Sequence, residues 1–417
     1  MKKEIFQAFL FAFTAAVTSF SQTVQMEPTP PTPVKVVITN TMPPIKPAAT
    51  PVPKPSQTPI IVGSNSAPQQ APSQNFNSRS MSFGQIKSRI AEAKRQMQTR
   101  PIATAMSEGT VMTDFVRVAF HNWKTRQLDY VVMTKESFLD TDAEKQTVSQ
   151  NGTRLSVRTI RGNGVNTPIV LIDENGETHQ PLLVQYPVEK FGKYVETAYY
   201  MSTHPGLVTP EVVNAGRYYV RNVIEIARDK LREKGIVIQP KVADIAERLA
   251  AVEHVDHQRF RAEYHPNIYN DVYALFALNE EQTYRYSVSS AGAGGMVQMI
   301  PATYRMVRSW HYNVPLMPDF VEGMRNHVNA SQAMLLYMQR TWNDLIANPT
   351  VAGALLEGIA TPEQLMAAGY NSNPARLAGY IQRGGENWTN LIPRETKIYL
   401  QIYESVDRWV PMKPRTR

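Results

Sequence analysis

Alternating apolar and polar positions dominate residues 108–200 and predict a small antiparallel β domain of about five strands. Turn signals rich in Asn, Asp and Gly separate the alternating runs, as at 150–152 and 173–176. The expected strands are Phe115–Phe120, Leu128–Met133, Arg154–Ile160, Ile169–Ile172 and Leu182–Tyr186. Because no nucleophile or metal-ligand spacing stands out there, we interpret the region as a structural or surface-contact module.

Helical periodicity flanks this β region on both sides. A short basic amphipathic helix is predicted over 82–98, with Phe83, Ile86 and Ile90 on one face. Such a face is suited to packing against the following domain, and contact with a membrane surface is the less favoured alternative.

Two helices are predicted to form a connector over 205–261. Pro210 fits the first turn of a helix that runs to about Glu233 and ends at Gly235. The second is expected over roughly Lys241–Glu263. Amphipathic helical patterns then continue over 262–410, so the predicted fold class is α+β with an all-α C-terminal domain.

The first residues have the pattern of a signal peptide over 1–21. Lys2 and Lys3 precede an apolar run, and small residues stand before Gln22. Residues 22–80 follow as a predicted disordered tether, because 13 of the 30 prolines lie between Pro28 and Pro72. The chain contains no cysteine, which excludes disulfides and a lipid-modified cysteine. We therefore expect an exported protein of the periplasm, cell envelope or exterior.

The composition limits the classes of binding partner that we expect. The formal net charge is +8, and an exported basic protein meets cell-wall polymers and lipid headgroups, so peripheral contact with either is expected. No array of basic and aromatic residues suited to stacking on single strands is visible, which argues against nucleic acid. The run Glu253–His257 contains two histidines but lacks a third ligand at a zinc-enzyme spacing, so no metal and no cofactor are expected. The sequence does not fix an oligomeric state.

A buried apolar helix with carboxylates at its end is predicted near residue 280. The run from Ala274 ends in Glu280 and Glu281, breaks into a Ser/Gly turn, and is expected to restart as a helix that carries Gln298. Burial disfavours a charged carboxylate and raises its pKa, so such an acid holds a proton near neutral pH.

Four segments in this part of the chain resemble the soluble lytic transglycosylases, in the order of that family's motifs. They are Ser289–Gly295 with Gln298–Thr303, Asn329–Met338, Ala367–Arg376 and Ile392–Leu400. The resemblance covers roughly 262–410 and implies a lysozyme-like all-α domain. The Glu-Ser pair that opens the family's first motif is not matched, since Glu281 or Gln282 stands at the Ser position.

The resemblance implies an exported enzyme that cleaves peptidoglycan glycan strands between N-acetylmuramic acid and N-acetylglucosamine. In that mechanism one Glu protonates the glycosidic oxygen and then deprotonates the muramoyl 6-hydroxyl, which closes a 1,6-anhydro ring. The residues that it carries over are catalytic Glu281 or Glu280, and substrate-binding Gln298, Tyr370, Asn371, Tyr399 and Ser289. Among these, the Tyr399 hydroxyl is expected to point toward the catalytic carboxylate.

Two features favour different catalytic residues. Glu280 keeps the family's usual spacing to Ser289 and has apolar residues on its own helical face. Glu281 keeps an aromatic, Tyr284, three residues on, and has Asn279 two before it, which gives it a narrow preference.

Two other functions remain open. A hydrolytic muramidase on the same fold would need a second carboxylate, for which Asp319 or Glu322 is available. The unmatched Glu-Ser pair also leaves open an inactive protein of cell-wall binding or assembly.

Overall fold

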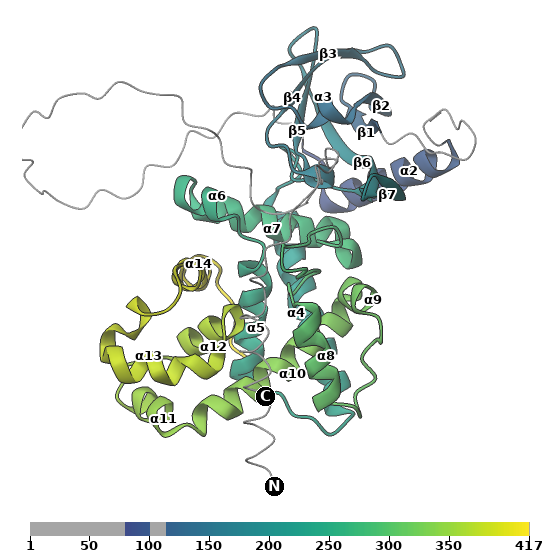
Figure 1. Ribbon diagram of the computed structural model, residues 1–417. Helices are drawn as coiled ribbons and strands as arrows, with labels where there is room; N and C mark the ends of the chain where they lie inside the picture. The colour runs from purple at the N-terminus through teal and green to yellow at the C-terminus, as the bar shows by residue number, and fades with distance from the viewer. Residues whose placement is uncertain (1–79, 101–113, 417) are drawn as a thin grey trace, which may run out of the picture. The chain divides into compact units, whose positions relative to one another are not determined.

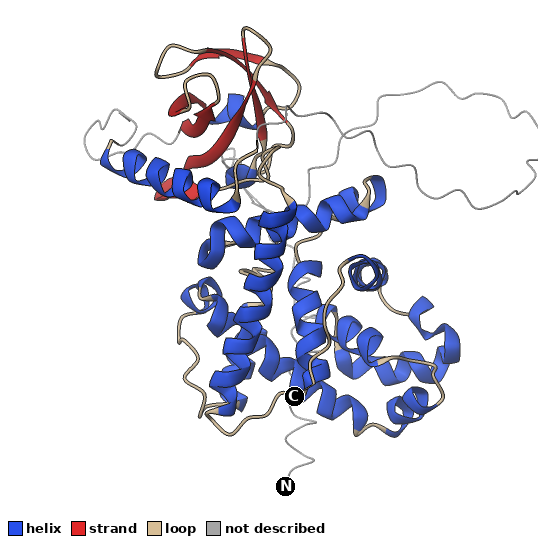
Figure 2. Cartoon of the chain, turned by 180° about the vertical axis from the view of Figure 1, so that it is seen from behind, coloured by secondary structure: helices blue, strands red, loops and turns tan. Residues whose placement is uncertain are grey.

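The computed structural model describes residues 80–100 and 114–416, apart from the Gln282 side chain, and these form a mixed α+β fold (Figure 1). They contain one antiparallel sheet of seven strands and thirteen α-helices (Figure 2). The predicted signal segment 1–21 and all but the last residue of the tether predicted over 22–80 lie outside the described residues.

The sheet is built by residues 115–200 in the strand order β2-β1-β6-β5-β4-β3, with β7 also pairing with β6. Its strands are β1 (Phe115–Asn122), β2 (Gln127–Thr134), β3 (Lys145–Val148), β4 (Arg154–Thr159), β5 (Ile169–Asp173), β6 (Thr178–Lys190) and β7 (Lys193–Tyr200). The five strands predicted from alternation are present, and β3 and β7 were missed. The predicted turns at 150–152 and 173–176 end in Gly152 and Gly176, both with positive φ.

The helix α2 (Phe83–Thr99) begins with a capping box made by Ser82 and Gln85. Its buried residues recur at helical spacing: Ile86, Ile90, Ala93 and Met97. They pack with apolar residues of β1, β2 and β6 and with Ala274, Ala277 and Leu278 of α7 (His265–Asn279). The helix predicted over 82–98 is therefore confirmed, and its apolar face is covered by the rest of the chain.

The region after residue 200 is helical. Proline at the first turn begins several of its helices, where the missing N–H costs no hydrogen bond. Its helices besides α7 are α4 (Pro210–Arg232), α5 (Pro240–Val252), α6 (His257–Ala262), α8 (Pro301–Trp310), α9 (Phe320–Arg325), α10 (His327–Ile346), α11 (Pro349–Leu356), α12 (Pro362–Asn371), α13 (Leu377–Gly384) and α14 (Arg394–Trp409). The short α3 (Lys135–Leu139) lies within the β region. Among the described helices, none is both long and apolar enough to cross a membrane.

The two predicted connector helices have different outcomes. The prediction for Pro210 to about Glu233 is confirmed by α4, and Gly235 follows with a φ of 75°. The prediction of a single helix over Lys241–Glu263 is wrong, because α5 ends at Val252 and a separate helix, α6, begins at His257. Both α4 and α5 pack directly against α10, and α5 also packs against α12 and α14.

Helices α4 and α7 approach each other closely at Gly216. A Cβ atom built on Gly216 would lie 1.8 Å from the Tyr273 carbonyl oxygen, so only glycine fits the contact. This contact holds α7 against α4 (Figure 1).

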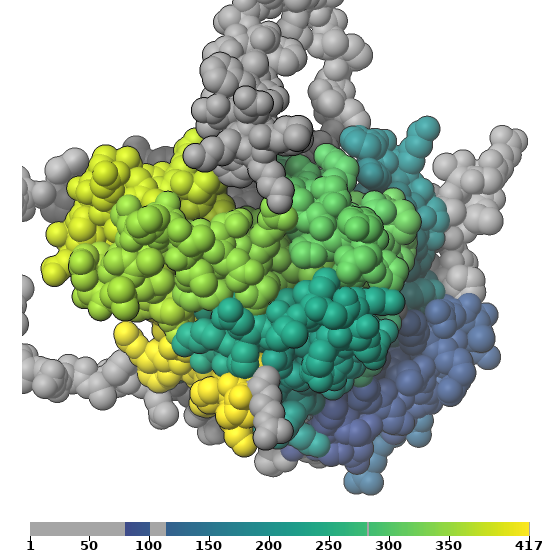
Figure 3. Space-filling model, turned by 90° about the horizontal axis from the view of Figure 1, so that it is seen from below, coloured from purple at the N-terminus to yellow at the C-terminus, as the bar shows by residue number. Residues whose placement is uncertain are grey.

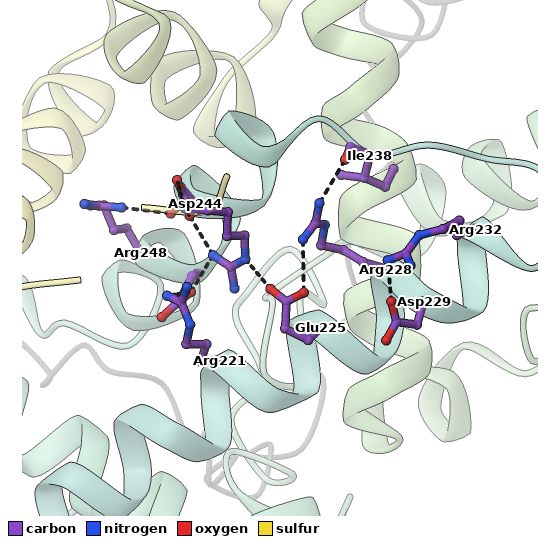
Figure 4. Close-up of polar contacts among 10 residues, drawn as sticks. Arg221, Glu225, Arg228, Asp229, Arg232, Ile238, Asp244 and Arg248 are labelled. Carbon is purple, nitrogen blue, oxygen red and sulfur yellow. Dashed lines mark hydrogen bonds and ion pairs between the residues drawn. The ribbon is translucent and has the colours of Figure 1, made fainter. Parts of the chain in front are cut away.

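A buried ion network joins α4, α5 and the C-terminal residues. The Arg415 side chain, only 3% exposed, pairs with Glu225, with Asp244 at 2.8 Å and with Glu247 at 2.6 Å. Figure 4 shows Glu225 on α4 facing this cluster and Asp244 on α5 across from it. In Figure 3 the yellow C-terminal residues adjoin the teal-green residues of this region. Hence the chain end is fixed to the helix that leads to residue 253.

Candidate active site around Glu253

Glu253 lies at the C-terminal end of α5, where a buried apolar helix stops. Ala250, Ala251 and Val252 before it are buried, and the Glu253 N–H donates back to the carbonyls of Leu249 and Ala251. The helix ends because Asp256 caps the start of α6, accepting from the N–H groups of residues 258 and 259. The carboxylate thus projects from a short turn between two helices.

The nearest polar partner of Glu253 comes from the far end of the sequence. The Tyr399 hydroxyl on α14 donates to Glu253 Oε1 at 2.5 Å. Burial and the charge of Glu253 raise the pKa of Tyr399 well above its usual value, so the phenol remains a donor. Tyr399 was expected to point toward the catalytic carboxylate, predicted as Glu281 or Glu280, and its hydroxyl instead donates to Glu253.

The Glu253 carboxyl retains its proton at neutral pH. Burial raises the pKa of Glu253 from 4.5 to about 8, the Tyr399 hydrogen bond lowers it, and the charge of Glu395 raises it further. The negative end of the α5 dipole acts in the same direction as burial. The residue as a whole is only partly covered by neighbouring atoms.

His254 fixes the loop beside Glu253. Its Nε2 atom donates to the Met296 carbonyl at 2.9 Å, and its ring stacks on Tyr284 with centroids 3.4 Å apart. Burial lowers the pKa of His254 to about 3, so the imidazole is neutral. It therefore orients the 296–298 segment without adding a positive charge next to Glu253.

The same segment is held from the other side by Tyr370 at the end of α12. The Tyr370 hydroxyl donates to the Val297 carbonyl at 2.7 Å. Burial raises the pKa of Tyr370 well above its usual value, and the charge of Glu253 adds to that rise. Tyr370 thus belongs to the same neighbourhood as Glu253.

Gln298 and Ser289 lie in a loop rather than on a helix. The prediction of a helix that carries Gln298 is wrong. Residues 287–300 form turns and two isolated bridges, and α8 begins only at Pro301. Gln298 has a φ of 47° and its Nε2 donates to the Gly295 carbonyl at 3.0 Å. Ser289 Oγ accepts from the Ala293 N–H at 3.0 Å, which closes the turn. The strained backbone at Gln298 is held by its neighbours and directs its amide into the loop.

Asn371 ties α12 to the start of α14. Its Oδ1 atom accepts from the Thr396 hydroxyl at 2.9 Å. This bond connects the helix that carries Tyr370 with the helix that carries Tyr399. Asn371 is thus placed to set the spacing of the two tyrosines.

Glu280 and Glu281 do not have the environment that was predicted for them. Both are exposed, and Glu280 forms an ion pair with Lys87 of α2, with about half of each side chain exposed. The prediction that one of them is a buried acid is wrong, because α7 ends at the surface beside α2. The buried helix whose end carries a shielded carboxylate is α5.

Sequence reasoning missed Glu253, although a signal was present. The apolar run that ends in Ala250–Val252 precedes Glu253, as expected of a buried helix with a carboxylate at its end. The run Glu253–His257 was instead considered only for metal binding. Among the residues that the structure describes, no group of three His, Cys, Asp or Glu side chains could hold a metal ion.

No protein-family model matches this sequence, and no curated protein or solved structure matches it either. The site is therefore interpreted from its own geometry and from the motifs in the sequence.

Proposed function

We propose that this protein is a lytic transglycosylase that cleaves the glycan strands of peptidoglycan, with Glu253 as its acid and base. The observation that carries the proposal is a carboxyl at the end of a buried helix that accepts from the Tyr399 hydroxyl and whose pKa burial raises to about 8. The helical part of the chain is proposed to have a lysozyme-like fold that includes α5. An exported protein acting in the periplasm or cell envelope would meet this polymer.

One carboxyl can perform both proton transfers. Glu253 protonates the glycosidic oxygen as the bond to the muramoyl anomeric carbon breaks, and the N-acetylglucosamine end leaves as an alcohol. The substrate's acetamido group stabilises the positive charge that develops at the anomeric carbon. The muramoyl 6-oxygen then bonds to that carbon and gives its proton to ionised Glu253. The 1,6-anhydro product forms and the acid is restored.

The surrounding residues suit this cycle. The Tyr399 hydroxyl stabilises the ionised intermediate state of Glu253, because it donates to the charged oxygen. Tyr370 and His254 hold the 296–298 loop next to the acid. The Gln298 amide donates within its loop to the carbonyls of Gly295 and Ser287, so its oxygen is the atom proposed to accept from a sugar acetamido group.

The hydrolytic alternative is less favoured by the contacts of its candidate residues. Asp319 Oδ1 accepts from the Glu322 N–H at 2.9 Å and so caps α9, and Glu322 pairs with Arg325 at 2.7 Å. The Glu-Ser pair is unmatched at Glu253 too, and the raised pKa of Glu253 is what favours an enzyme over an inactive wall-binding protein. His254 then stands at the Ser position and bonds to the loop.

Mass spectrometry of muropeptides released from purified sacculi tests the proposal. The wild type should release 1,6-anhydromuropeptides, and Glu253→Gln should lose at least ~100-fold of that activity because the proton is removed. Glu280→Gln and Glu281→Gln are matched controls on exposed carboxylates and should remain active.

Three other results would contradict the proposal. Products with reducing ends would indicate hydrolysis, and no products from the wild type would indicate a binding protein. An inactive Glu280→Gln or Glu281→Gln variant beside an active Glu253→Gln variant would move the acid to α7.

A further inference from the structure

A polar cavity lies in the N-terminal part of the described chain. It has a volume of about 770 Å³ and lies between α2 and the hairpin that joins β1 to β2. Helix α2 contributes Gln85, Ser88 and Arg89, and the hairpin contributes Trp123, Lys124 and Arg126. This volume falls in the range of cavities that hold small molecules or short peptides.

Positive charge predominates around this cavity. Its lining includes Arg89, Lys124 and Arg126 against one carboxylate, Glu177. Arg89 is engaged, because it pairs with Glu92 at 3.1 Å and donates to the Arg126 carbonyl at 3.3 Å. The exposed side chains of Lys124 and Arg126 form no ion pair with the described residues. Two cations are thus available to an incoming anion.

A buried histidine at the same cavity has an unused polar atom. His121 is 5% exposed, and its Nδ1 atom has no hydrogen-bond partner among the described residues. Burial lowers the pKa of His121, and the nearby Arg89 and His179 act in the same direction, so the ring is neutral. A buried polar atom without a partner is costly unless water or a ligand satisfies it.

An aromatic wall accompanies these polar groups. The Trp123 ring meets His121 edge to face, with centroids 4.6 Å apart, and remains partly exposed. An indole face binds apolar groups well and can also pack on peptide planes. The cavity therefore combines two free cations, a neutral ring nitrogen, small polar side chains and an aromatic surface.

We propose that this cavity binds a short peptide through its carboxylates, and that its ligand is the stem peptide of peptidoglycan. This identification of the ligand rests on the proposed function, because cleavage of the glycan strand brings its stem peptides to the protein. Lys124 and Arg126 pair with the carboxylates, Trp123 covers an apolar side chain, and His121 with Gln85 and Ser88 bonds to peptide groups. The β region would then hold the polymer by its peptide while the site at Glu253 acts on its sugar.

Calorimetric titration of the full chain with a free stem tripeptide ending in diaminopimelate tests this inference. The peptide lacks sugar, so it probes this cavity separately from the site at Glu253. The double variant Lys124→Gln/Arg126→Gln should bind at least about tenfold more weakly, the scale of one lost charge-assisted hydrogen bond. Arg154→Gln is the matched control, because this exposed arginine on β4 does not line the cavity and should not alter binding.

The outcomes separate this inference from the proposed function. Equal binding by the wild type and the double variant, or no binding by the wild type, overturns the inference even if sacculi are cleaved. Inorganic phosphate or anionic phospholipid vesicles that bind as tightly as the peptide overturn the ligand class. Peptide binding that depends on Lys124 and Arg126 supports the inference even if the wild type releases no anhydromuropeptides.

Discussion

Replacing Glu253 by Gln should stabilise the protein while it abolishes activity. The carboxyl has a pKa of about 8 in the folded chain, raised mainly by burial, against 4.5 for an ordinary Glu. Below pH 4.5 it is protonated in both states and does not affect folding. Between pH 4.5 and 8 the unfolded chain releases the proton and the folded chain retains it, so stability falls as pH rises.

The expected magnitude follows from linkage. The free energy of unfolding falls by about 1.4 kcal/mol for each pH unit within this window. By pH 7 the wild type has lost at most about 3.5 kcal/mol, and less because Glu253 is partly exposed. The amide in the Glu253→Gln variant has no titrating proton, so the stability advantage of this variant over the wild type should increase from pH 5 to pH 8.

Urea unfolding followed by circular dichroism at pH 5, 6, 7 and 8 measures this difference. Glu281→Gln serves as the control, since the Glu281 side chain is exposed. If the wild type and Glu253→Gln keep a constant difference in stability over this range, the carboxyl is not held protonated by the fold. Its assignment as the acid would then lose its physical basis.

Two further variants test the supports of the site. Tyr399→Phe removes the hydrogen bond that lowers the pKa of Glu253. The pH above which wall cleavage declines should therefore rise by about one unit, and an unchanged or lower value would contradict the assignment. Arg415→Ala removes the guanidinium that pairs with Asp244 and leaves Glu225 and Glu247 with only Arg228 and Arg221 as partners, so it should cost about 3–5 kcal/mol in urea unfolding. Arg232→Ala breaks an exposed pair and should cost under about 1 kcal/mol; equal losses would refute the account.

Much of the fold is visible in local patterns. The helices α2 and α4 were predicted with nearly the right ends, because caps, a first-turn proline and an apolar face mark where they begin and which side they bury. The strands β3 and β7 were missed for a physical reason. β3 is an edge strand, and both strands have few buried residues, so their sequences lack the apolar alternation that marks a buried strand.

Short sequence motifs predicted several residues of the proposed site, but they did not predict Glu253, its proposed acid. Tyr370, Gln298 and Tyr399 were selected because their segments match short motifs. In the structure Tyr399 bonds to Glu253, and Tyr370 bonds to the Val297 carbonyl next to Gln298. Glu253 lies 36 positions before Ser289, with α6 and α7 in between. A search at the usual short motif spacing therefore stops at Glu280 or Glu281. The hydrogen bond that identifies Glu253 joins residues that are 146 positions apart.

Helices α5 and α7 share one local pattern, and only tertiary contacts distinguish them. Both α5 and α7 are buried helices that end in a glutamate, Glu253 and Glu280. The end of α7 lies at the surface, where Glu280 pairs with Lys87 of α2 and about half of each side chain is exposed. The end of α5 meets the Tyr399 phenol and buried surroundings, which keep a carboxyl protonated. A buried helix with a terminal carboxylate therefore identifies candidates for an acid, and the partner at the helix end decides which one can donate a proton.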